Sequence, residues 1–291
     1  MKIFRRTVLI ITILAALFSA MYPELAAGAV TWKTMNGEHF IIHYLNDESF
    51  AQEVSHKAES YYRNIATDLG YPRYSEFWIW EKRVKVYIYS DHASFLKATG
   101  QPAWSHGMAD YNLKSISGYT GSIGFIDSVL PHEIAHLIFR DFVGFTGVIP
   151  LWLDEGVAQW GESEKREGVR RIIKEMYKGG NLLQVKDMMN LDMYRLKEMN
   201  RLFVRPSLAK KGGEPGALFL TTEALINVYY VEAVSLITFL TEKFGAYSFS
   251  AFCRALRNGD SVESALKSAY PDYIRNLEEF EDRWVEHLET L

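Results

Sequence analysis

The sequence predicts an α+β fold in which a mixed sheet with helices comes first and a mainly helical half follows. Two patterns support this prediction. Strand-like alternation of β-branched and aromatic residues is confined to residues 30–126, whereas residues 127–291 place apolar positions at helical spacing between glycine and proline breaks. The apolar content of 48%, with 14% aromatic residues, is sufficient for a sizeable core.

The first half alternates strands with helices. Its expected elements are strands at 38–44 and 83–89, a helix at 49–69, a short helix through residue 99 that Asp91 caps, and a glycine-interrupted strand or hairpin within 105–126. The aromatic run at 77–80 is expected to pack in the core or along a ridge.

The second half predicts a series of helices that glycines and prolines separate. Their expected ranges are 127–141, 154–178, 228–244, 246–257, 261–269 and 272–289. Residues 192–222 lack periodicity and carry a small basic cluster, so an exposed loop or lid is expected there.

Residues 1–29 are typical of a secretory signal peptide. Three basic residues precede an apolar run at 8–20, and small residues at 27 and 29 offer a cleavage site before Val30. The run is shorter than the roughly 20 residues that span hydrocarbon. We therefore expect one exported domain over residues 30–291, periplasmic or extracellular. The alternative is an uncleaved segment that anchors the chain to a membrane through residues 1–22.

The charge of the chain limits the kinds of partner that are expected, and its cysteine count limits how the fold is stabilised. The net charge is −4 and both signs are mixed along the chain, so no nucleic acid partner is expected, which leaves peptides or small molecules. Cys253 is the single cysteine of the sequence, so no intramolecular disulfide can form in the expected oxidising compartment. Stability must therefore come from the core.

The segment PHEIAH at 131–136 carries the clearest chemical signal. On a helix that Asp127 or Ser128 caps, with Pro131 in its first turn, His132 and His136 lie one turn apart. Both imidazoles can then reach one metal ion. Glu133 lies to the side of the pair, where a carboxylate can act as a base on a metal-bound water. The alternative is a helix whose two histidines are satisfied by backbone partners.

Glu155 is the natural third ligand of such an ion. It follows His136 after a turn containing glycine and proline, and it falls in the first turn of the next expected helix, DEGVAQWGE. Two histidines and a carboxylate, with one open position, form a catalytic zinc site. Asp154 is expected to cap this helix and Gly156 to permit close packing. Gln159 either orients a ligating imidazole or is a plain polar position.

The motifs HEIAH and WLDEG together resemble the gluzincin metallopeptidases, specifically the peptidase MA-like group. The resemblance implies a zincin-like fold over residues 30–291, with the zinc site between a sheet-containing part (30–126) and a helical part (127–291). It also implies that His132, His136 and Glu155 bind one Zn²⁺ and that Glu133 is the general base.

Two further expectations come from the same resemblance. A tyrosine on a later helix stabilises the oxyanion in such enzymes, and Tyr230 fits best, with Ala233 as the accompanying small residue; Tyr229 remains open. The family binds substrate along an edge strand, which residues 107–126 would supply. The Gly-Ala-Met-Glu-Asn signature by which related aminopeptidases hold a free amino terminus is missing, which argues against exopeptidase action. The choice between endopeptidase and exopeptidase action stays open.

The sequence thus predicts an exported zinc metallopeptidase that hydrolyses peptide bonds in a peptide or protein substrate. The alternatives are a catalytically silent, exported zinc-binding protein of the same fold and a membrane-anchored scaffold that binds partners through its helical half. The remaining histidines, including His39 and His43, are expected to be surface residues or to have local hydrogen-bond partners.

Overall fold

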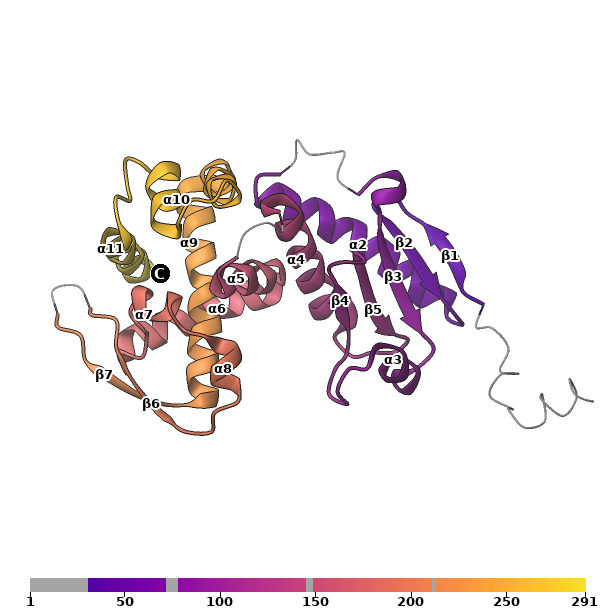
Figure 1. Cartoon of the computed structure of the whole chain (residues 1–291), viewed down its shortest axis with the longest axis horizontal. Coiled ribbons are helices and arrows are strands. Elements are labelled where there is room, and N and C mark those ends of the chain that lie inside the picture. Colours follow the sequence, from indigo (N-terminus) through magenta and orange to yellow (C-terminus); the bar gives the residue numbers. More distant parts are fainter. Residues whose placement is uncertain (1–30, 72–77, 145–148, 211–212) are drawn as a thin grey trace, which may run out of the picture. The chain divides into compact units, whose positions relative to one another are not determined.

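The computed structural model describes residues 31–71, 78–144, 149–210 and 213–291 (Figure 1). The expected signal peptide at 1–29 lies outside these residues. Residues Thr34–Leu291 form one unit, in which a five-stranded mixed sheet with its helices is followed by a mainly helical half. The α+β class predicted from sequence is confirmed at this level.

The sheet has the strand order β1-β2-β3-β5-β4. Its strands are β1 (Lys33–Asn36), β2 (Phe40–Tyr44), β3 (Val84–Tyr89), β4 (Met108–Asp110) and β5 (Ser115–Tyr119). Strands β2, β3 and β5 run parallel, and β4 pairs antiparallel with β5 at the edge. The expected hairpin within 105–126 is therefore confirmed, while β1 was not predicted.

Helix α2 (Glu48–Asp68) connects β2 to β3 and packs on β2 and on helix α4. Asp47 caps it, because its carboxylate accepts a hydrogen bond from the Phe50 N–H at 3.0 Å. Buried residues recur at helical spacing: Ala51, Val54, Ala58, Tyr62, Ile65 and Ala66. Helix α3 (His92–Thr99) is capped by Asp91 as predicted.

The second half begins with a π turn, η3 (Phe125–Val129). The helices that follow are α4 (Leu130–Val143), α5 (Leu151–Gly161), α6 (Ser163–Gly179), α7 (Val185–Met189), α8 (Met193–Lys197), α9 (Thr222–Arg257), α10 (Val262–Ala269) and α11 (Leu277–Thr290). The single helix predicted at 154–178 is wrong, because Glu162 leaves the helical conformation and separates α5 from α6. The break predicted at Gly245 is present, with φ 82° inside α9.

Residues 192–222 have more regular structure than the exposed loop or lid that was expected. They contain α8 and an antiparallel hairpin of β6 (Leu202–Pro206) and β7 (Ala217–Thr221). Phe203 and Leu218 face inward and are buried. The prediction failed because the outward positions are apolar as well, which hides the two-residue alternation that marks a strand.

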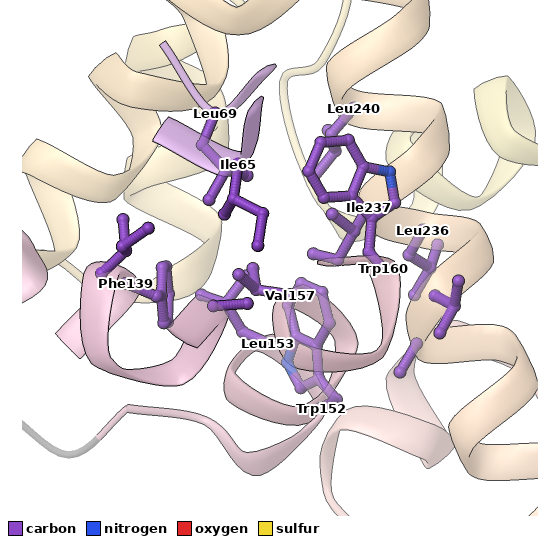
Figure 2. Close-up of a cluster of buried hydrophobic side chains, with 14 of the residues drawn as sticks. Ile65, Leu69, Phe139, Trp152, Leu153, Val157, Trp160, Leu236, Ile237 and Leu240 are labelled. Atoms are coloured by element: carbon purple, nitrogen blue, oxygen red, sulfur yellow. The ribbon is translucent and has the colours of Figure 1, made fainter. Parts of the chain in front are cut away.

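Helix α5 lies between α4 and α9 in the core (Figure 2). Its buried side chains pack with residues from α2, α4 and α9, including Ile65, Phe139, Leu236, Ile237 and Leu240. Helices α5 and α9 touch at Gly156, since a Cβ at this position would lie 3.0 Å from the Ala233 carbonyl oxygen. Glycine therefore permits the close packing that was expected at this position.

Helix α9 is long and apolar enough to cross a membrane, yet 72% of its most apolar window is buried in the protein.

Glu232 lies in this helix with no exposed surface. One carboxylate oxygen accepts a hydrogen bond from the Leu183 N–H at 2.6 Å, and the other has no partner among the described residues. Burial raises the pKa of Glu232 well above its usual range, and nearby Glu281 and Asp187 add to the shift. Burial in the folded protein therefore favours the neutral, protonated form of this side chain.

We expect Glu232→Gln to stabilise the protein at pH 8 and to have little effect at pH 4. Above pH about 4.5 the unfolded chain ionises this carboxyl while the folded chain keeps it protonated, so wild-type stability falls as the pH rises. A glutamine removes this penalty and keeps the acceptor for Leu183. A rise in Tm of roughly 2–4 °C at pH 8, about 1 kcal/mol, is expected by calorimetry.

The matched control is Glu53→Gln, at an exposed glutamate of α2. A difference between wild type and Glu232→Gln that is the same at both pH values would contradict a neutral Glu232.

Candidate metal centre

The helix that carries the two histidines starts differently from the prediction. Neither Asp127 nor Ser128 caps it; α4 continues directly from the π turn, with Val129 at its N-cap position and no side-chain cap. The Ser128 hydroxyl instead donates to the Glu162 carboxylate. Pro131 lies in the first turn of α4 as expected. His132 and His136 follow one turn apart, with ring centroids separated by 4.8 Å.

Glu155 approaches these histidines from α5. Its Oε2 atom lies 3.9 Å from His132 Nε2, and potential ligand atoms of His132, His136 and Glu155 all lie within 4.8 Å of one another. Helix α5 begins earlier than predicted, with Pro150 at the N-cap position, so Asp154 is a buried residue within the helix and not its cap. The three side chains singled out from the sequence are therefore neighbours in space.

Two carboxylates hold the histidine rings from behind. His136 Nδ1 lies 2.9 Å from Asp154 Oδ1, and His132 Nδ1 lies 3.0 Å from Glu162 Oε1. Each ring then has its Nε2 atom free of these bonds, and such carboxylate contacts fix the orientation and raise the basicity of a ligating imidazole. Asp154 and Glu162 fill the role that was considered for Gln159.

The negative charges of both carboxylates are balanced by nearby hydrogen-bond donors. Asp154 accepts hydrogen bonds from the Arg140 guanidinium, and Glu162 accepts from Lys165 Nζ at 3.0 Å as well as from Ser128. Burial tends to raise the pKa of both acids, but these partners and the histidines hold it below the usual range. Asp154 and Glu162 are therefore ionised at neutral pH, as orienting groups must be.

Glu133 lies beside the ligand group and is only partly exposed. Burial raises the pKa of Glu133; His132 and His136 oppose this, while Glu155 and Asp154 add to it. A carboxylate with a raised pKa is a stronger proton acceptor than one in water. Burial lowers the pKa of His136, but the hydrogen bond and charge of Asp154 outweigh it and leave the pKa raised.

Tyr111 is a neighbour of the site that the sequence analysis missed. It follows β4 directly, and its ring meets His136 edge-on at a centroid distance of 5.8 Å, while the Arg140 guanidinium lies 4.0 Å from the ring centroid. Burial raises the pKa of Tyr111, and the charge of Glu133 contributes. No local sequence pattern marks such a contact, because it depends on how the β4–β5 hairpin folds over α4.

The two candidate tyrosines of α9 differ in exposure. Tyr229 is buried, whereas Tyr230 is partly exposed and meets the Tyr229 ring edge-on at 5.6 Å. Ala233 follows Tyr230 by about one turn and contacts Gly156, the residue next to Glu155. Tyr230 is thus the more accessible of the two on a helix that touches α5 beside the site.

The donor set fits a catalytic zinc ion. Two imidazoles and one carboxylate are typical ligands, and donors of one tetrahedral zinc lie about 3.3 Å apart, so small side-chain movements would suffice. A second group, Glu38, His39 and Glu59, also brings potential ligand atoms together. In this second group His39 Nδ1 lies 2.7 Å from Glu59 Oε2, and the His39 ring stacks on Tyr62. This agrees with the expectation that His39 has a local hydrogen-bond partner.

Comparison with models of known protein families finds no match to this chain, and comparison with curated proteins finds no similar sequence.

We expect Asp154→Asn to weaken zinc binding about 10-fold to 100-fold. The amide oxygen still accepts from His136, but the negative charge that supports the imidazole and balances Arg140 is lost. Competition with a fluorescent zinc chelator at fixed pH measures the change. Asp260→Asn, at an exposed aspartate, is the matched control. Unchanged zinc affinity in Asp154→Asn would show that the orienting carboxylate is unimportant for the metal.

Proposed function

We propose that this chain is an exported zinc metallopeptidase with a zincin-like fold, similar to the gluzincins of the peptidase MA-like group. One observation carries the proposal. The Nδ1 atoms of His132 and His136 are hydrogen-bonded to carboxylates, and potential ligand atoms of these histidines and of Glu155, from a separate helix, lie within 4.8 Å of one another. Glu133 lies beside this group and is not part of it. The alternative, a helix whose two histidines only make local hydrogen bonds, gives no reason for Glu155 to lie beside them.

In this proposal His132, His136 and Glu155 hold the metal. A zinc ion bound there would polarise the scissile carbonyl and lower the pKa of a bound water from about 15.7 to about 7. Glu133 accepts the proton of the attacking water and returns it to the leaving amine. Tyr230 donates a hydrogen bond to the oxyanion.

The peptide substrate would pair with β4, because this short strand forms the edge of the sheet just before α4. Residues 1–29 would direct the chain out of the cytoplasm.

We expect Glu133→Gln to lower kcat/KM for peptide cleavage by about 10²-fold to 10⁴-fold while zinc stays bound. Glutamine is nearly the same size but cannot accept the proton. Cleavage of a peptide library is followed by mass spectrometry, and the zinc content is measured on the same samples. Glu164→Gln, at an exposed glutamate of α6, controls for the loss of charge.

His136→Ala serves as the variant without metal. Wild-type activity in Glu133→Gln would exclude this mechanism. A wild-type protein that holds zinc but cleaves none of the library would favour the silent zinc-binding alternative.

A further inference from the structure

Edge strand β4 follows helix α4 in the same direction (Figure 1). Just before the strand, a Cβ on Gly107 would lie 2.7 Å from Val129 Cγ1, so the chain packs here against the start of α4. Just after the strand, the Tyr111 ring meets the His136 ring, one turn beyond His132 on the same helix. The strand therefore lies alongside the part of α4 that carries both histidines.

The candidate metal ligands lie level with the middle of this strand. The stretch from Gly107 to Tyr111 spans about 13 Å as an extended chain, and the helical stretch beside it rises about 10 Å. Ala109 is at the centre of the strand, and His132 lies within the helical stretch. Alternate residues of a strand share a face, and Ala109 and Tyr111 both pack against the core. The strand thus passes the metal ligands and does not end at them.

Exposed side chains mark both ends of the strand. Leu113, which follows Tyr111 in the turn, is 71% exposed. At the other end the Ser122 hydroxyl donates to the His106 carbonyl oxygen at 3.1 Å, and the adjacent Ile123 is 89% exposed. The outer edge of β4 is unpaired, because this strand is the last of the sheet. An extended peptide on this edge can continue past the metal ligands in both directions.

The charged residues of the β4–β5 hairpin are engaged within the protein. The Asp110 carboxylate accepts hydrogen bonds from two N–H groups of the turn, each at 3.0 Å. Lys114 Nζ lies 2.6 Å from the Asp141 carboxylate. These are the only two charged side chains of residues 108–119, all of which the structure describes. A terminal amine or carboxylate is held best by an opposite charge, and this hairpin offers none that is unengaged.

We propose that the candidate site cleaves internal bonds of extended peptide segments, which pair with β4 on both sides of the bond that breaks. This inference rests on the proposed peptidase function and names its substrate class. The strand would hold about two residues on either side of the bond. Water adds across that bond, so each cut gives one fragment with a new carboxylate and one with a new amine.

A library of synthetic peptides made in two forms tests this inference. One form has free termini, and the other has an acetylated amino end and an amidated carboxyl end. Mass spectrometry is expected to show both forms cut at the same internal bonds at similar rates. Shortening a cleaved peptide to one residue on either side of the bond is expected to lower kcat/KM about tenfold, because the hydrogen bonds of one flank are lost. Glu133→Gln is the blank.

A capture experiment locates the two flanks of the peptide without turnover. Leu113→Cys and Ile123→Cys are each combined with Glu133→Gln; the native Cys253 is fully buried, which makes the reaction selective. A cleaved peptide is made with a thiopyridyl-activated cysteine about two residues before or after the bond. Each variant is expected to react about tenfold faster with one of these peptides, and the two variants with opposite ones. Tyr247→Cys, at a residue that is 81% exposed on α9, is expected to react equally with both.

Two results would overturn the inference and leave the peptidase function intact. One is zinc-dependent release of terminal residues only, which the blocked termini abolish. The other is a preference of both cysteine variants for the same peptide, which would place the substrate on one side of the metal. If the wild-type protein cleaves no more of the library than Glu133→Gln does, the proposed function and this inference both fail.

Discussion

The packing of α5 between α4 and α9 is the constraint on which the candidate site depends. Glu155 lies close to His132 because its own helix is packed on both sides through buried side chains, among them Trp152 and Val157. Gly156 allows α9 to approach so closely that the two backbones touch. The position of a charged ligand is thus set by apolar packing, which is rigid because protein interiors are dense.

Buried charge is the cost of this arrangement. Asp154 is almost fully buried, and an isolated carboxylate in such a place would be strongly destabilising. Hydrogen bonds with His136 and Arg140 offset the cost of burying the Asp154 charge. The charge of Glu162 is offset in the same way by His132, Ser128 and Lys165. Hydrogen-bonded pairs of this kind add little net stability but restrict each side chain to one orientation. That restriction is what a metal site requires of its ligands.

The sequence predicted the ligand group because helical spacing is local information. His132 and His136 are neighbours in any helix, and Glu155 was inferred from a second helix that a short turn must fold back. Glu162 and Tyr111 could not be inferred in this way. Glu162 reaches His132 only because the chain leaves the helix there, and Tyr111 reaches His136 through the fold of a hairpin.

The same contrast holds for the fold. Strands with one buried face, such as β2 and β3, were found by their alternation, with bounds close to those of the structure. The β6–β7 hairpin was missed because apolar residues occupy both of its faces. A pattern method detects the difference between an apolar side and a polar side, and the sequence of this hairpin has apolar residues on both sides. The failure therefore marks the same residues whose exposure is unusual in the structure.

Tyr111 links the edge strand to the candidate metal ligands. The Asp110 carboxylate accepts hydrogen bonds from the N–H groups of Asn112 and Leu113, each at 3.0 Å, and so fixes the turn that follows β4. Tyr111 lies within this turn, against Arg140, which in turn holds Asp154 behind His136. In the proposed function a peptide that pairs with β4 would meet a strand whose end is connected to a metal ligand through three side chains. Substrate position and ligand orientation would then be set by one continuous set of contacts.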